Sequence, residues 1–238
     1  MLLDWITCFY PQIANPWTLQ VGIFNLPWIY VVLHPLYYLG PIISAIIMQI
    51  AVIISIWYIC DRLNLPILHR VFIYLSPPVI WGMIMGQFDG IILLSYFLPG
   101  WVAPISVLIK PQISIGSIRN LKPISFLPAI ILAISAYIIW KWPFSIQFPS
   151  VGGPFDDTFR GPLWNWSPWP FGLILLPILI FSKKISTKMG ISPFLSPYIG
   201  VHSLIGPLIA LATTNFWLFL LGWIFLWIRW WKMVNVGL

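Results

Sequence analysis

The sequence predicts an all-α protein, a polytopic transmembrane helical bundle of about seven spans, and three observations lead to this class. First, 60% of the 238 residues are hydrophobic and only 7% are charged, whereas a soluble globular domain carries charge on about a quarter of its residues. Second, the apolar residues form continuous runs rather than alternating with polar ones, which favours helices over an outer-membrane barrel. Third, the few charged residues are distributed unevenly among the loops between these runs.

Seven apolar stretches come near the roughly 20 residues that a helix needs to cross a bilayer. They are 41–60, 68–86, 90–109, 123–141, 168–182, 194–212 and 215–230. Because 168–182 is short for a span, we expect the tryptophan-rich residues before it to lie at the membrane interface.

Residues 21–39 are also apolar, but Pro27 and Pro35 interrupt them, which favours an interfacial or re-entrant helix over a span. The predicted organisation is therefore a single domain in two parts. An outer tail with interfacial or re-entrant helices covers 1–40, and the transmembrane bundle covers 41–238.

The basic residues predict an orientation, because short cytoplasmic loops collect Lys and Arg. With seven spans and an outer N-terminus, ten of the twelve Lys and Arg fall in cytoplasmic loops, and only Lys141 and Arg160 fall outside. Four of the five aspartates fall on the outer side, and only Asp61 falls inside. We therefore expect an integral protein of a prokaryotic cytoplasmic membrane, with the N-terminus outside and the C-terminus inside.

Charge and motif searches exclude several other function classes. A net charge of +7 would suggest nucleic acid in a soluble protein, but twelve scattered cations are too few for a phosphate-binding face, so no nucleic-acid partner is expected. The three histidines, His34, His69 and His202, fall in three different segments and give no metal-binding pattern. The sequence contains neither a glycine-rich phosphate loop nor a Ser-His-Asp order.

Polar residues on the predicted outer side are the candidates for a site. Asp89 lies between Gly86 and Gly90, and two interpretations of it stay open: it caps the following span, or it belongs to a site that a ligand approaches closely. Asp4 opens a tail that folds back against the outer surface, with a frayed terminus as the alternative. The outer tryptophans form either an interfacial belt or part of a site.

Several short motifs follow one another along the chain. They are GQFDG over 86–90, LIKPQ over 108–112, NWS over 165–167 and LSPY over 195–198, with Asp4 followed by FYP over 9–11 upstream of them. This ordered set resembles the motifs of glycosyltransferase family 87, within the GT-C superfamily of membrane glycosyltransferases. Since each motif is short, their order carries the resemblance.

The resemblance implies a GT-C-like fold and a function. A hexose such as mannose would be moved from a polyprenyl-phosphate donor in the membrane to an acceptor on the extracytoplasmic face. Asp4 would be the catalytic base, and the substrate would be bound by Gln87, Asp89, Arg160, Asn165, Trp164 and Trp166, with Arg160 on the donor phosphate. The donor is a lipid-linked substrate, so membrane lipid is the expected partner and no cofactor is expected.

Two departures from the family pattern support an alternative function. Family members have a transmembrane helix before the catalytic aspartate, and the interval from Gln87 to Lys110 is one span long where the family has room for two. Lys110 then falls on the cytoplasmic side, unless 90–109 is a re-entrant hairpin broken at Pro99 and Gly100. The alternative is a non-catalytic integral membrane subunit of a larger complex, derived from the same scaffold, with a partner membrane chain supplying the missing helix.

Overall fold

The computed structural model describes residues 4–19, 25–118, 121–143 and 165–236 of the chain. Within these residues the fold is entirely helical, which confirms the all-α class. The first half comprises η1 (Trp5–Phe9), α1 (Tyr10–Ala14), α2 (Trp28–Leu33), η2 (His34–Leu39), α3 (Gly40–Arg62), α4 (Ile67–Tyr74), α5 (Pro77–Met85), α6 (Asp89–Ile92), η3 (Leu93–Tyr96) and α7 (Val102–Ile109). The second half comprises α8 (Pro111–Ser114), η4 (Ile115–Ile118), η5 (Pro123–Phe126), α9 (Leu127–Trp140), η6 (Phe171–Leu175), α10 (Leu176–Phe181), α11 (Ile185–Ile191), η7 (Ser192–Leu195), η8 (Val201–Leu204), α12 (Ile205–Ala212) and α13 (Phe216–Val236).

Three helical stretches are long and apolar enough to cross a membrane: Trp28–Arg62, Pro123–Trp140 and Phe216–Asn235. The pair α4 and α5, bent by 46°, would make a fourth. The bend falls at Pro77 and Pro78, because a proline lacks the backbone N–H that would continue the helix. These helices are consistent with an integral membrane protein; the seven-span count and the GT-C-like fold are not confirmed.

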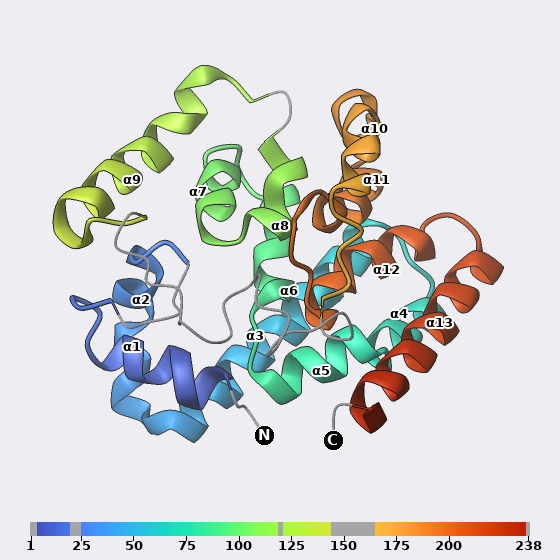
Figure 1. The fold of residues 1–238 in the computed structure, drawn as a ribbon, viewed down its shortest axis with the longest axis horizontal. Helices are drawn as coiled ribbons and strands as arrows, with labels where there is room; N and C mark the ends of the chain where they lie inside the picture. Colours follow the sequence, from blue (N-terminus) through green and yellow to red (C-terminus); the bar gives the residue numbers. More distant parts are fainter. Residues whose placement is uncertain (1–3, 20–24, 119–120, 144–164, 237–238) are drawn as a thin grey trace.

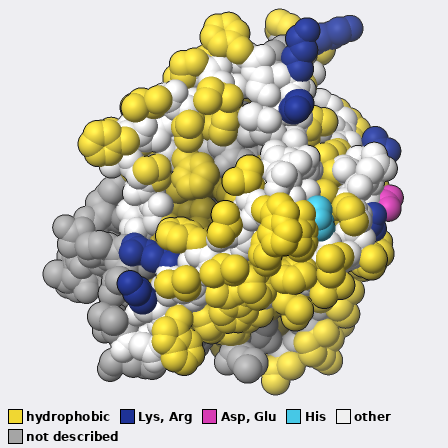
Figure 2. Space-filling view, turned by 90° about the vertical axis from the view of Figure 1, so that its right-hand side faces the viewer, with side chains coloured by type: hydrophobic (Ala, Val, Ile, Leu, Met, Phe, Trp, Pro, Cys, Tyr) yellow, Lys and Arg dark blue, Asp and Glu magenta, His cyan; other side chains and the backbone are white. Residues whose placement is uncertain are grey.

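Hydrophobic side chains also cover much of the face shown in Figure 2, on which only a few basic side chains are visible. Along α3, α9 and α13, large apolar residues such as Ile54, Ile138 and Phe225 are more than half exposed. A soluble protein rarely leaves so wide an apolar surface uncovered, and the lipid of a bilayer would cover it.

The predicted span 90–109 is not a single helix, and this prediction is wrong. α6 and η3 form its first half and α7 its second, and the chain turns between them near Pro99 and Gly100. The side chains at the two ends, Asp89 and Lys110, are bonded to each other. The segment is therefore a helical hairpin, the form that its proline and glycine allow.

The predicted spans 168–182 and 194–212 are also broken. Their longest apolar helices are Phe171–Phe181 and Val201–Ala212, both shorter than the roughly 20 residues of a crossing. Prolines stand before or inside each of them, at Pro170, Pro177 and Pro197.

Contacts between distant segments do not support the predicted alternation of loops. Arg229, predicted inside, lies over the ring of Trp166, predicted outside, with 5.5 Å from Cζ to the ring centroid. His69 Nδ1 and the backbone oxygen of Ala212, predicted on opposite sides, are 3.1 Å apart. Figure 1 shows α13 running beside α4 towards α5, where the ring centroids of Trp81 in α5 and Trp230 in α13 lie 6.3 Å apart.

The N-terminal segment packs against the bundle. The Trp28 indole donates to Ser135 Oγ of α9 over 2.9 Å, and the Trp140 indole donates to the backbone oxygen of Pro16 over 3.0 Å. α2 and η2 lead directly into α3 through Gly40, whose φ is +79°. The expected boundary between tail and bundle therefore falls within one continuous helical stretch.

Candidate functional site

The position of Asp4 is fixed by its neighbour Trp5. The Trp5 side chain is fully buried, and its indole N–H donates to Ser44 Oγ of α3 over 3.0 Å. Gly86 ends α5 with a φ of +77°, and a Cβ there would lie 2.6 Å from Trp5 Cβ. Only a glycine lets the two backbones approach so closely. Asp4 is thereby brought to Gln87, whose Nε2 donates to Asp4 Oδ2, and the frayed-terminus interpretation is wrong.

Lys110 joins Gln87 to Asp89. The hairpin returns the chain to its starting point, so Lys110 at the end of α7 faces Asp89 at the start of α6. Lys110 Nζ donates to Gln87 Oε1 over 2.7 Å and also to Asp89 Oδ1. Its ammonium lies 4.7 Å from the ring centroid of Phe88, within the range of a cation–π contact.

The second oxygen of Asp89 is bound from another part of the chain. His202 Nδ1 lies 2.7 Å from Asp89 Oδ2, and Ser203 Oγ donates to the same oxygen over 3.0 Å. Both residues belong to η8, which packs against α5, and a Cβ at Gly82 would lie 3.5 Å from His202 Cβ. Asp89 therefore connects the hairpin with η8, and the N-cap position of α6 is occupied by Phe88 rather than by Asp89.

The Asp89 carboxylate is charged although it is buried. Asp89 is 1% exposed and Lys110 is 5% exposed, and burying an isolated charge costs several kcal/mol. Burial alone raises the pKa of Asp89, but the charges of Lys110 and His202 and their hydrogen bonds outweigh it and hold the pKa below its ordinary value. The result is a preorganised group of ionised side chains.

A cavity of about 470 Å³ opens beside this group, and we call it the Asp4 cavity. It is lined by Asp4, Cys8, Phe9, Asn25, Tyr30, Gln87, residues 107–112, Trp142, Ser196, Tyr198 and His202. Asp4, Gln87, Lys110 and His202 supply acid, amide, ammonium and imidazole groups to one space, while Phe9 and Trp142 supply aromatic faces. This mixture of apolar walls and a few polar groups is typical of a small-molecule site.

The structure brings together some of the predicted site residues and not others. Asp4 and Gln87 line the cavity, whereas Asp89 lies behind it, with both oxygens already bonded to protein groups. Asn165 binds backbone groups instead, since its Nδ2 donates to Pro197 O and its Oδ1 accepts from Ile199 N. Neither Asn165 nor Trp166 lines the cavity.

The two remaining predicted substrate-binding residues, Arg160 and Trp164, lie outside the described residues.

Lys110, His202 and Ser203 are the members that sequence reasoning did not place in the site. The sequence contains an indication for Lys110. This residue stands in the LIKPQ motif, and Pro99 and Gly100 within 90–109 allow a hairpin that returns it to Asp89. The sequence contains none for His202 and Ser203, since nothing in it indicates that η8 folds back onto the GQFDG motif.

Within the residues that the structure describes, no group of three or more His, Cys, Asp or Glu side chains is arranged to hold a metal ion. Comparisons of the chain with protein-family models, with curated proteins and with solved structures found no match. The chemistry of the site therefore rests on its own geometry.

Proposed function

We propose that this protein is a membrane glycosyltransferase that moves a hexose, such as mannose, from a polyprenyl-phosphate donor to an acceptor hydroxyl. The observation that carries the proposal is the difference between two carboxylates. Asp89 is buried and bound by two basic side chains, whereas Asp4 lines the cavity and has no cation within 4.0 Å among the described residues. Asp4 is thus the carboxylate that a substrate can reach.

Asp4 would act as the general base. The acceptor oxygen attacks the anomeric carbon of the donor sugar and forms the new glycosidic bond. The bond between that carbon and the phosphate oxygen breaks, and its electron pair leaves with the polyprenyl phosphate. The acceptor proton passes to an Asp4 carboxylate oxygen, which must lie within hydrogen-bond reach of the hydroxyl. Gln87 Nε2, bonded to Asp4 Oδ2, would hold the carboxylate in place.

Lys110 would stabilise the leaving phosphate. An ammonium carries three N–H donors, and Gln87 and Asp89 accept two of them. Lys110 lines the cavity, so its third donor can serve an anionic group there. A preorganised cation beside a developing negative charge lowers the barrier of such a transfer.

The test uses the full chain reconstituted in membranes with a polyprenyl-phosphate hexose. Asp4→Asn keeps the shape of the side chain and removes the base, so we expect transfer to fall at least a hundredfold, the usual contribution of general base catalysis. Asp61→Asn makes the same change at an exposed acid away from the cavity and should leave the rate unchanged. Equal rates for Asp4→Asn and the unaltered protein would overturn the assignment.

The alternative function, a non-catalytic membrane subunit, makes the opposite prediction for the same preparation. The chain would purify as a stoichiometric component of a larger complex, with no sugar transfer in any variant. The buried ion pair of Asp89 and Lys110 supports the enzyme, because buried charges are costly and cluster at functional sites.

A further inference from the structure

A second cavity, of about 970 Å³, lies between α11, α12 and Leu63, the residue that follows α3. It shares no lining residue with the Asp4 cavity, and we call it the Lys184 cavity. We propose that it binds an anionic phospholipid, with the phosphate at its polar end and an acyl chain along its apolar end. This binding does not depend on the proposed transferase function.

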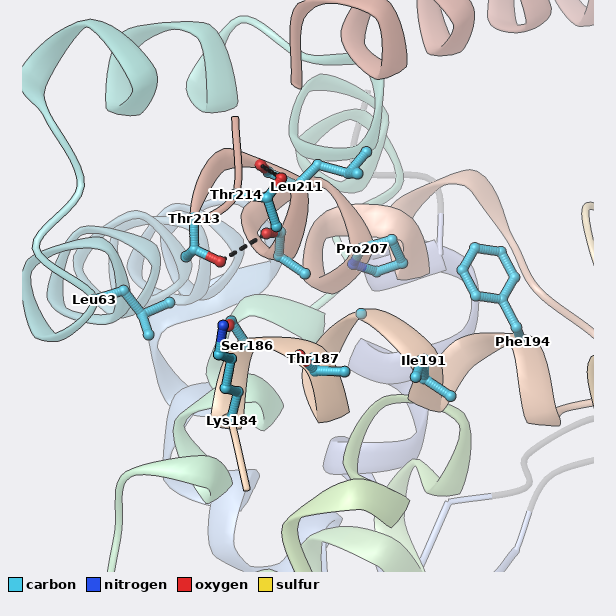
Figure 3. Close-up of a pocket in the computed structure, with 12 residues that line it drawn as sticks. Leu63, Lys184, Ser186, Thr187, Ile191, Phe194, Pro207, Leu211, Thr213 and Thr214 are labelled. Carbon is cyan, nitrogen blue, oxygen red and sulfur yellow. Dashed lines mark hydrogen bonds between the residues drawn. The ribbon is translucent and has the colours of Figure 1, made fainter. Parts of the chain in front are cut away.

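The polar end of the Lys184 cavity matches a phosphate group. Figure 3 shows the Lys184 side chain extending beside Ser186 towards Leu63 and Thr213. Lys184 is exposed and has no ion-pair partner among the described residues. The hydroxyls of Ser186 and Thr187, which also line the cavity, make no hydrogen bond within the part of the chain that the structure describes. One ammonium and two hydroxyl donors suit the oxygens of a phosphate diester.

The charges around this end favour an anion. Lys183 and Lys184 are adjacent and both exposed, and the sequence contains no Asp or Glu after Asp157. Asp61, two residues before Leu63, already pairs with Arg70 over 3.2 Å. An anionic ligand would therefore meet an excess of positive charge.

The opposite end of the Lys184 cavity is apolar. Ile191, Phe194 and Pro207 lie together at this end, away from Lys184, as Figure 3 shows. A free phosphate ion would use only the polar end, whereas a phospholipid also covers these side chains with hydrocarbon. The division of the cavity into a polar and an apolar end therefore favours a lipid over a free anion.

The position of the cavity in the fold supports the same ligand. Leu63 directly follows Arg62, where the stretch Trp28–Arg62 ends, and Thr214 lies two residues before Phe216, where the last apolar stretch begins. Where transmembrane helices end, the hydrocarbon of a bilayer gives way to its headgroups. Basic pockets between transmembrane helices are known to bind anionic headgroups.

The experiment titrates the purified full chain in detergent micelles with dioleoylphosphatidylglycerol and counts bound lipid by native mass spectrometry. Lys184→Gln should weaken binding roughly fivefold, the effect of one lysine near an anionic headgroup. Lys184→Arg keeps the charge and should bind as the unaltered protein does. The matched control is Lys183→Gln, which removes an exposed neighbouring charge outside the cavity and should change binding less than twofold.

Four results would overturn the proposal. Equal losses in Lys184→Gln and Lys183→Gln would show attraction to the surface charge only. Equal binding of dioleoylphosphatidylcholine, which carries no net charge, would remove the role of Lys184. Displacement of the lipid by a large excess of inorganic phosphate, or binding of a polyprenyl phosphate in place of phosphatidylglycerol, would assign the cavity to another ligand. Because the readout is lipid binding, a failed transferase assay leaves this result unaffected.

Discussion

The two cavities differ in how their charged side chains are paired and buried. At the Asp4 cavity, each charged side chain contacts another charged or polar one, and Asp89 and Lys110 are almost completely buried. At the Lys184 cavity, the lysine is exposed and no carboxylate contacts it within the described residues. A charged side chain that is paired inside the protein can hold reacting groups in position. An exposed charged side chain without an ion-pair partner is suited to attracting a ligand. The comparison thus separates the proposed transferase site from the proposed lipid-binding site.

The largest effect is expected at the buried ion pair behind the Asp4 cavity. Asp89→Asn leaves the buried Lys110 and the partly buried His202 without their carboxylate, and breaking a buried ion pair in this way costs about 3–5 kcal/mol. We expect a loss of that size in the free energy of unfolding, measured by denaturant titration in micelles. Asp61→Asn removes an exposed partner of Arg70 and should cost less than about 1 kcal/mol. Similar losses for the two variants would mean that burial does not distinguish the pairs.

A smaller effect is expected where the N-terminal segment meets α5. Gly86→Ala places a Cβ against Trp5 and forces a left-handed residue, which alone costs about 1–2 kcal/mol. Gly40→Ala serves as the control for the contact, because its φ of +79° is also positive but nothing lies within 4 Å of a Cβ there. Its ψ of 164°, unlike the 31° of Gly86, lies in a region that is essentially restricted to glycine, so the two backbone costs differ. The close contact with Trp5 should add about 1–3 kcal/mol to the backbone cost at Gly86, the usual range for overpacking.

The same glycine pair tests how Asp4 is positioned. Displacing Trp5 also displaces Asp4 from Gln87, so Gly86→Ala should lower sugar transfer while Gly40→Ala leaves it unchanged. Equal effects of the two substitutions on transfer would show that the close approach of Trp5 is not needed.

The sequence predicted the all-α class and the site residues Asp4, Gln87 and Asp89. It did not predict their partners Lys110, His202 and Ser203. Composition and run length predicted spans at 41–60, 123–141 and 215–230, which overlap the apolar helices Trp28–Arg62, Pro123–Trp140 and Phe216–Asn235, because a long continuous apolar run is visible in the sequence. The motif around Gln87 and Asp89 was also recognisable.

The remaining errors have one physical origin. A hydropathy run measures apolar length and not direction, so the hairpin over 90–109 resembled a span although Lys110 returns to Asp89. One wrong crossing then reverses every later loop. This is why Lys110 was assigned to the side opposite Asp89, the residue that it contacts. His202 reaches Asp89 through contacts between segments more than 100 residues apart, which no local pattern records.

The smallest effect is expected at the Lys184 cavity, where a lysine can be compared with Lys110. Lys184→Gln changes an exposed side chain with no ion-pair partner among the described residues, so the free energy of unfolding in lipid-free micelles should change by less than about 0.5 kcal/mol. Lys110→Gln leaves the Asp89 carboxylate buried with one basic neighbour fewer and should cost about 3 kcal/mol or more. Added phosphatidylglycerol should stabilise the unaltered protein more than Lys184→Gln, because a ligand bound only by the folded state raises its stability. A large loss for Lys184→Gln without lipid would give Lys184 a structural role and remove the contrast between the cavities.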